Sequence, residues 1–232
     1  RRCLSTLMQK PPLWINADYA TVTPENEIML SFTIDPASEI RTYILERKTG
    51  ASGEFGQIYN YTGDPGTFIY NDGSADISTV NYYRLSAVNN CSLPVISSNL
   101  ASNIVLGLTR EEDDIILSWN PYREWTGMVS SYSIFCNTGK GYEERYSVPA
   151  NDTSFTFGYS GIMYEVSGNE VCFRVVALEG PDIHVSSAES RSSVICTDAT
   201  ELITVPNAFT PDNNQVNDLF MPLLSFTPAD YH

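Results

Sequence analysis

The sequence predicts an all-β protein made of two tandem β-sandwich domains, followed by a truncated β-rich segment. Three observations predict this fold: a composition that suits strands, a repeat of about ninety residues, and short stretches in which apolar and polar residues alternate. The chain has 232 residues, which is long for one small sandwich and sufficient for two.

The composition favours strands and argues against two classes of partner. Hydrophobic residues make up 42% of the chain, enough for packed cores, and the 14 tyrosines suit strands better than helices. The 13 prolines and 14 glycines are spread along the chain, as expected for many short turns. The formal net charge of −15 argues against binding to nucleic acid or to an anionic lipid surface.

The repeat is visible as blocks of sequence that recur in the same order at nearly one offset. The matching blocks are Ile28–Phe32 with Ile115–Trp119 (115 − 28 = 87), Val80–Val88 with Glu170–Leu178 (170 − 80 = 90), and Ser102–Leu106 with Ser192–Cys196 (192 − 102 = 90). A unit of this length is a whole domain rather than a short solenoid repeat.

Each unit contains short strands with a period of two. Tyr83, Leu85 and Ala87 point to one face of a strand, while Arg84 and Ser86 point to the other. The predicted strands are roughly 13–22, 27–34, 42–48, 55–61, 67–71, 80–89 and 99–108 in the first unit, and 114–120, 131–136, 142–148, 153–158, 170–178 and 191–197 in the second. About seven short strands per domain indicate an immunoglobulin-like sandwich.

These motifs resemble those of fibronectin type III domains. Ile115–Trp119 resembles the second strand of that family, in which the tryptophan fills the centre of the core, and the stretch from Tyr83 to Asn89 resembles its sixth strand. The first unit has Phe32 where tryptophan is usual, and the second has Phe173 where tyrosine is usual, so both keep a large aromatic residue. The resemblance covers residues 13–198.

The last part of the chain carries a different motif. Val205–Pro211 resembles the opening of the gliding-motility-associated C-terminal domain of Bacteroidetes surface proteins, and Asn217–Asp218 fits the end of the loop that follows. The loop itself departs from the family, because Asp212–Gln215 lacks the usual glycine. The resemblance implies export by type IX secretion and retention at the outer cell surface.

Together these patterns divide the chain into four parts. We read the sequence as an internal fragment of a longer exported protein, with no transmembrane segment in it. The expected parts are the end of a preceding segment (1–10), a first fibronectin type III-like domain (11–108), a second one (109–198), and the truncated start of the gliding-motility-associated C-terminal domain (199–232).

Cysteine spacing predicts a disulfide rather than a zinc site. None of the five cysteines forms a Cys-x-x-Cys pair, and only two histidines are present. Cys172 and Cys196 fall on adjacent antiparallel final strands, where opposed residues suit a disulfide. The alternative is two unpaired thiols that act as small hydrophobic groups. At the repeat offset their counterparts in the first unit are Tyr82 (172 − 90) and Leu106 (196 − 90).

The Asx-rich loop near the end of the chain offers a weak metal candidate. Asp212, Asn214 and Asp218 provide side-chain oxygens of the kind that bind calcium. The spacing of an EF-hand is absent, and Asx residues also build turns by bonding to their own backbone. We therefore expect no resident metal and no cofactor.

Function is predicted mainly from the resemblances. The sequence lacks the Gly-x-Ser-x-Gly, His-Glu-x-x-His and phosphate-loop motifs of common enzyme classes, so we expect no catalysis. We predict a monomeric structural or interaction module, a stalk or adhesin, of an exported bacterial surface protein, with a protein or glycan partner. The alternative is a carbohydrate-binding module in which Trp14 and Trp125 stack on sugar rings. Both tryptophans would otherwise anchor loops against the edge of the sandwich.

Overall fold

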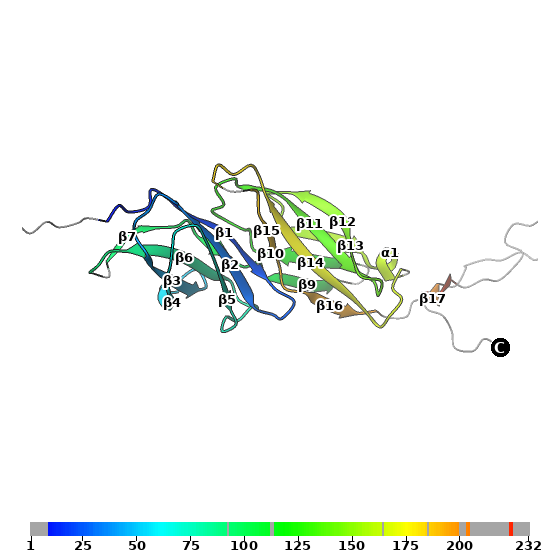
Figure 1. Cartoon of the computed structure of the whole chain (residues 1–232). Coiled ribbons are helices and arrows are strands. Elements are labelled where there is room, and N and C mark those ends of the chain that lie inside the picture. The colour runs from blue at the N-terminus through cyan, green and yellow to red at the C-terminus, as the bar shows by residue number, and fades with distance from the viewer. Residues whose placement is uncertain are drawn as a thin grey trace, which may run out of the picture.

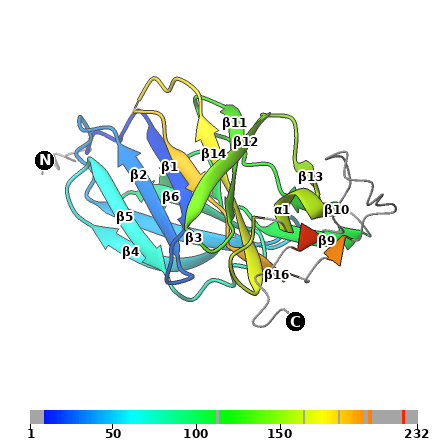
Figure 2. The same cartoon turned by 90° about the vertical axis from the view of Figure 1, so that its right-hand side faces the viewer.

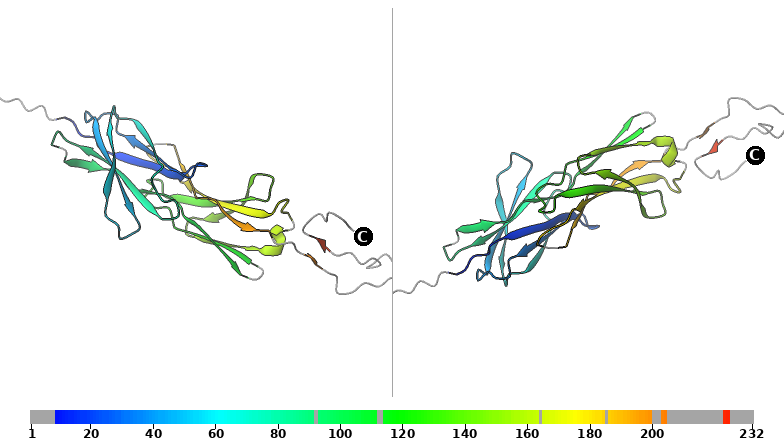
Figure 3. Two further views of the ribbon diagram at one scale, coloured as in Figure 1. Left: turned by 90° about the horizontal axis from the view of Figure 1, so that it is seen from below. Right: turned by 90° about the horizontal axis from the view of Figure 1, so that it is seen from above.

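The structure consists of two β-sandwiches arranged one after the other in an elongated molecule (Figure 1). This computed structural model describes residues 9–91, 93–111, 114–163, 165–184, 186–199, 203–204 and 223–224. Figures 2 and 3 show the arrangement from other sides, with α1 facing the viewer in Figure 2 at the end of the second sandwich that lies away from the first. The prediction of an all-β fold with tandem immunoglobulin-like sandwiches is confirmed.

The first sandwich packs a three-stranded sheet against a larger one. The strands of the smaller sheet are, in spatial order, β1 (Ile15–Val22), β2 (Ile28–Ile34) and β5 (Thr67–Asp72). The larger sheet has the order β4 (Gly56–Thr62), β3 (Thr42–Thr49), β6 (Asn81–Val88) and β7 (Pro94–Ser97), with β8 (Ala101–Ser102) also paired to β6. All the paired strands of this sandwich are antiparallel. As is common in antiparallel sheets, each sheet packs one face on the core.

The second sandwich repeats this topology. Its smaller sheet has the order β13 (Ser154–Gly158), β10 (Asp114–Trp119) and β9 (Leu106–Glu111). Its larger sheet has the order β12 (Tyr142–Pro149), β11 (Val129–Asn137), β14 (Glu170–Glu179) and β15 (Glu189–Arg191), with β16 (Ile195–Asp198) also paired to β14. The short helix α1 (Tyr159–Met163) follows β13, and a small pair of strands, β17 (Ile203–Thr204) and β18 (Leu223–Leu224), comes after the second sandwich.

The predicted core aromatics lie at the centres of the two sandwiches. Phe32 and Tyr83 are fully buried in the first core, and Trp119 and Phe173 are buried in the second. The predicted alternation holds for Tyr83, Leu85 and Ala87, but Ser86 on the opposite face is buried as well, and its hydroxyl lies 2.8 Å from that of Ser97.

The boundary between the domains differs from the prediction. The strand expected at 99–108 is in fact two strands: β8 closes the first sandwich, and β9 opens the second, where Leu106 pairs with Trp119. The crossing between them is fixed by two side chains. Asn103 accepts a hydrogen bond from the backbone of Asn81 (2.8 Å), and Asn120 accepts one from Val105 (2.7 Å). The boundary therefore lies at 103–105 and not after 108.

This boundary corrects the alignment of the last strands. Ser98 and Ser192 bond in the same way to Leu85 and Val175, which gives an offset of 94 (192 − 98) for the final strands. The structural counterpart of Cys196 is therefore Ser102 (196 − 94) and not Leu106. The offset increases because the loop between β14 and β15 is longer than the loop between β6 and β7.

Cys172 and Cys196 are directly opposed on β14 and β16 and are joined by a disulfide, as predicted. Their bond closes a loop with a sequence separation of 24, which restricts the unfolded chain. We expect reduction to lower the free energy of unfolding by about 2–4 kcal/mol, measured by urea denaturation with and without reductant. The variant with both Cys172→Ser and Cys196→Ser should be insensitive to reductant. Equal stability of the oxidised and reduced protein would contradict this prediction.

Among the residues that the structure describes, no helix is long and apolar enough to cross a lipid bilayer.

Candidate functional site

The junction between the sandwiches is built on the outer edge of β1. This strand pairs with β2 on one side, and its other side lies against β15 of the second sandwich (Figure 1). The hydroxyl of Ser190 donates to the carbonyl oxygen of Ala20 (2.6 Å), and the backbone of Arg191 donates to the Thr21 hydroxyl (2.9 Å). The two domains are thus joined along β1 by hydrogen bonds that involve side chains, and not by the backbone-to-backbone hydrogen bonds of a continuous sheet.

Trp125 fills the centre of this junction. Its side chain comes from the loop between β10 and β11, is only 5% exposed, and packs on Tyr122 with the rings tilted by 30° and their centroids 3.9 Å apart. Its indole nitrogen donates to the backbone carbonyl of Asp18 (2.5 Å), while the Tyr122 hydroxyl accepts from the backbone of Ala20 (3.2 Å). The first sandwich covers the ring, so Trp125 anchors its loop at the junction, and the alternative in which it stacks on a sugar is excluded.

The remaining polar groups along β1 also have partners. Asn99 accepts from the backbone of Ala17 (2.8 Å) and donates to the backbone carbonyl of Glu124 (2.6 Å). The hydroxyl of Thr126 donates to the side-chain oxygen of Asn16 (2.7 Å). An edge strand normally presents unpaired backbone groups that invite another strand. In β1 these contacts occupy that edge, so the two sandwiches meet in one specific arrangement.

Trp14 is the other tryptophan at this end of the first sandwich. Its ring stacks on His184 from the loop after β14, with centroids 4.1 Å apart, and it is only partly buried. One ring face is therefore occupied by a neighbour within the protein. The two tryptophans proposed for glycan stacking do not form a shared platform, since one is buried and the other is packed on histidine.

Two buried carboxyl groups lie at the junction. Asp18 accepts hydrogen bonds from the hydroxyls of Ser31 (2.8 Å) and Thr33 (2.9 Å), yet burial raises its pKa above the ordinary value. Glu179 is 5% exposed and accepts from the backbone of Gly127 (3.0 Å) and of Ala188 (3.1 Å). Burial raises the pKa of Glu179 from 4.5 to about 7. Both shifts favour the protonated form in the folded protein.

The raised pKa of Glu179 predicts a pH-dependent junction. The stability that this group contributes is complete below about pH 4.5 and is lost as the pH rises toward about 7, because the unfolded chain ionises first. Across this range we expect the free energy of unfolding of the wild type to fall by at most about 3 kcal/mol because of this group. The variant Glu179→Gln should not show this fall when urea denaturation is measured at a series of pH values. The control is Glu189→Gln, which removes an exposed carboxylate from neighbouring β15. A profile identical in wild type and Glu179→Gln would contradict the assignment.

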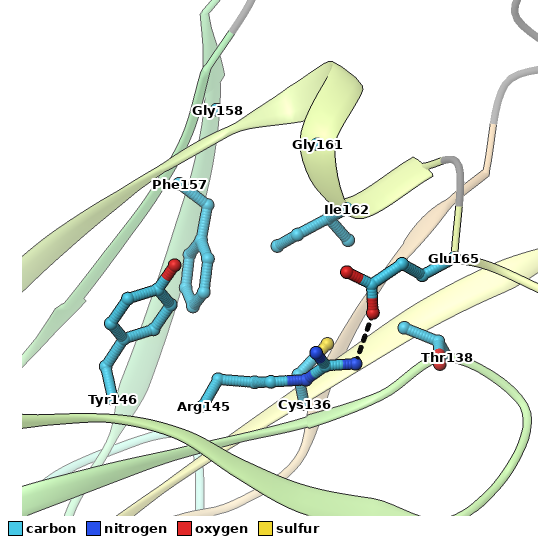
Figure 4. Close-up of a pocket in the computed structure, with 9 residues that line it drawn as sticks. All are labelled: Cys136, Thr138, Arg145, Tyr146, Phe157, Gly158, Gly161, Ile162 and Glu165. Carbon is cyan, nitrogen blue, oxygen red and sulfur yellow. Dashed lines mark hydrogen bonds and ion pairs between the residues drawn. The ribbon is translucent and has the colours of Figure 1, made fainter.

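A cleft of about 450 Å³ opens at the other side of the second sandwich, between β12, β13 and α1 (Figure 4). Tyr146 and Phe157 lie along one side of it, and Ile162 and Glu165 lie on the other. Arg145 extends across the floor and forms an ion pair with Glu165. The cleft therefore combines aromatic rings with a fixed pair of opposite charges.

The chemistry of this cleft suits binding rather than nucleophilic attack. Cys136 is buried at its base, and burial raises the pKa of its thiol to about 11, which keeps it protonated at neutral pH. The guanidinium of Arg145 also lies 3.7 Å from a carboxylate oxygen of Glu143. The two ion pairs hold the guanidinium of Arg145 in position. The cleft therefore offers a ligand hydrogen-bond donors from Arg145, acceptors from Glu165, and the rings of Tyr146 and Phe157.

The weak calcium candidates of the C-terminal loop fall outside the part of the chain that the structure describes. Asp212, Asn214 and Asp218 lie outside the described residues, as do Val205–Pro211 and Asn217–Asp218 of the C-terminal motif. Within the part of the chain that the structure covers, Glu170 clusters with the sulfurs of Cys172 and Cys196. Those sulfurs form the disulfide and are not available as thiolate ligands.

Comparisons with known proteins give likenesses to solved structures only. No family model matches the sequence, and no curated protein matches it. A pectate lyase, PelI from Erwinia chrysanthemi, has 14% identity and a TM-score of 0.30 over 41% of this chain, which spans only 27% of the lyase. The FN1–FN3 domains of chicken CNTN1 have 14% identity and a TM-score of 0.29 over 82% of this chain and 68% of that one. The chicken interferon gamma receptor alpha chain has 13% identity and a TM-score of 0.31 over 84% of this chain and 99% of that one. At these TM-scores we base the fold on the strand topology described above.

Proposed function

We propose that this chain is a non-catalytic structural and interaction module whose two sandwiches act as one rigid unit in an exported surface protein. The observation that carries the proposal is the edge of β1, which the second sandwich covers with side chains instead of leaving it to solvent. Domains joined only by a flexible linker have no such specific contacts, and relative motion is then the rule.

Rigidity follows from where these contacts lie. The connection between the domains spans only residues 103–105, and Asn103 and Asn120 hold both of its sides. Across the junction, Trp125 of the second sandwich is only 5% exposed, and its indole nitrogen donates to the backbone carbonyl of Asp18 in the first (2.5 Å). A short connection and a tightly packed junction together favour a fixed angle between the sandwiches.

Two observations support an exported setting. Disulfides persist mainly in oxidising compartments, and Cys172 and Cys196 form one. The resemblance of Val205–Pro211 to the gliding-motility-associated C-terminal domain of Bacteroidetes surface proteins supports type IX secretion and a stalk or adhesive role at the outer surface.

Small-angle X-ray scattering on the chain tests the proposed rigidity. We expect an elongated monomer whose scattering fits a single arrangement of the two sandwiches. A matched variant with a long Gly-Ser insertion after Val105 should instead require an ensemble of arrangements. If the unmodified chain itself needs such an ensemble, the rigid-unit proposal fails. Intact mass under non-reducing conditions, lower by two hydrogens, checks the disulfide in the same sample.

A further inference from the structure

The two sandwiches share a β-bulge at the same place but fill it with different residues. On β4, Tyr59 pairs with Leu45 and Gln57 pairs with Glu46, so Ile58 is the extra residue. On β12, Tyr146 pairs with Ile134 and Glu144 pairs with Phe135, so Arg145 is the extra residue at an offset of 87 (145 − 58). Ile58 packs against the first core, whereas Arg145 reaches into the cleft (Figure 4). Bulges re-aim side chains in this way near binding sites.

The space for the cleft also comes from a difference between the repeats. In the first sandwich, Arg47 lies opposite Tyr83 and forms an ion pair with Asp72 (2.7 Å). The matching position opposite Phe173 in the second sandwich holds Cys136, whose side chain is much smaller. Replacement of a long arginine by cysteine at this level leaves room beneath β12, and the cleft occupies that room.

One wall of the cleft is an exposed and fixed aromatic ring. Tyr146 is 49% exposed, and its ring lies 4.6 Å from that of Phe155 and 5.4 Å from that of Phe157. In the first sandwich the matching strands are β4 and β5, and they carry a similar ring pair. Tyr59 on β4 is 43% exposed, and its ring centroid lies 4.9 Å from that of Tyr70 on β5. Aromatic rings held in this way present a flat apolar face at low entropic cost.

The floor of the cleft carries two partly exposed charged groups, Arg145 and Glu165. Arg145 uses one terminal nitrogen for Glu165 and Glu143, but its Nε is buried and has no partner among the described residues. Because this Nε is out of reach of a ligand, the groups that can bond to one are the terminal guanidinium nitrogens of Arg145 and the carboxylate of Glu165, whose side chains are 30% and 49% exposed. On the α1 side, a Cβ atom added at Gly161 would meet nothing within 4 Å, so this side of the cleft is open.

We propose that this cleft binds a neutral pyranose sugar, which stacks on Tyr146 while its hydroxyl groups bond to Arg145 and Glu165. A sugar ring has an apolar face of C–H groups and an edge of donors and acceptors, which matches the two walls. The volume of about 450 Å³ lies within the range of about 300–1,000 Å³ typical of small-ligand sites.

The charge distribution selects against acidic ligands. Two carboxylates, Glu143 and Glu165, flank the single guanidinium of Arg145, and the whole chain carries a net charge of −15. An anionic sugar would meet net repulsion at the cleft and at long range. The site therefore fits neutral hexoses or pentoses rather than uronic acids.

The test is a binding panel of neutral gluco-, galacto-, manno- and xylo-oligosaccharides, with oligogalacturonate as the charged arm, followed by calorimetry on the best binder. Tyr146→Ala should weaken binding by about tenfold or more, whereas Tyr59→Ala, the matched change in the first sandwich, should leave it within about twofold. Arg145→Ile, which installs the residue of the first sandwich, should also weaken binding by about tenfold. Gly161→Leu should also weaken binding, because its side chain would fill the open side of the cleft next to α1.

Several results would overturn the proposal. Binding of no neutral oligosaccharide at millimolar concentration would do so, as would binding of the charged arm alone. Equal losses in Tyr146→Ala and Tyr59→Ala would move the site elsewhere. Circular dichroism and thermal unfolding confirm that each variant is folded. The scattering experiment on the junction is independent of these outcomes, so failure here leaves the structural role standing.

Discussion

Replacement of Trp125 by alanine is expected to lower the free energy of unfolding by about 3–5 kcal/mol and to release the two sandwiches from each other. The indole is 5% exposed, packs on the tilted ring of Tyr122, and donates to the carbonyl oxygen of Asp18. Alanine would leave a cavity between the domains and an unpaired carbonyl on the edge of β1. The loss thus combines packing with an unmet hydrogen bond.

Urea denaturation followed by circular dichroism measures this loss, and small-angle scattering measures the release. The control is Trp14→Ala, which removes a ring that is only partly buried and stacks on His184. We expect that change to cost about 1 kcal/mol, without altering the scattering profile. An unchanged denaturation midpoint and an unchanged profile in Trp125→Ala would show that the junction is not a stabilising interface.

Replacement of Asp72 by alanine is expected to destabilise the first sandwich by about 3–5 kcal/mol. Asp72 is 2% exposed and accepts hydrogen bonds from Arg47 (2.7 Å), the Tyr83 hydroxyl (3.1 Å) and the Ser74 hydroxyl (2.7 Å). Burial alone would raise the pKa of Asp72, but the bonds from Ser74 and Arg47 outweigh it and hold the pKa below the ordinary value. Removal of the carboxylate leaves Arg47 and Tyr83 without their shared partner.

The same shift fixes the sign of the acid dependence. Because the pKa of Asp72 is lower in the folded protein, its contribution is present above about pH 3.8 and is lost as the pH falls through the folded value. Asp72→Ala should therefore lose stability mainly near neutral pH and differ less from wild type in acid. The control is Asp76→Ala, which removes an exposed aspartate that accepts a hydrogen bond from the backbone of Ser78 and should change the stability much less. A comparable loss in both variants would argue against the buried network.

The sequence was sufficient to predict most of the two sandwiches, because period-two patterns and large aromatics depend on local burial. Phe32 and Trp119 lie at the centres of their cores, and the cysteines of β14 and β16 meet as expected. The domain boundary was wrong for a physical reason. The apolar run from 99 to 108 suits one strand or two, and only pairing shows that Leu106 belongs with Trp119.

The functional residues were harder to predict, because their surroundings come from distant parts of the chain. Trp125 lies in a polar loop next to Glu124, so the sequence suggests exposure, and only the first sandwich buries it. Arg145 looked like an ordinary polar residue on an edge strand. The repeat offset of 87 does align it with the apolar Ile58, and that mismatch, like the one between Arg47 and Cys136, is a signal of the cleft.

The covered edge of β1 also determines how the molecule would respond to mechanical load. A pull applied at the two ends of the chain enters the first sandwich through β1, which is the strand that the second sandwich grips at Asp18, Ala20 and Thr21. These transverse contacts would have to shear before β1 could peel away from β2. In a force spectrometer, the pair should therefore give one high rupture event for both sandwiches instead of two independent ones.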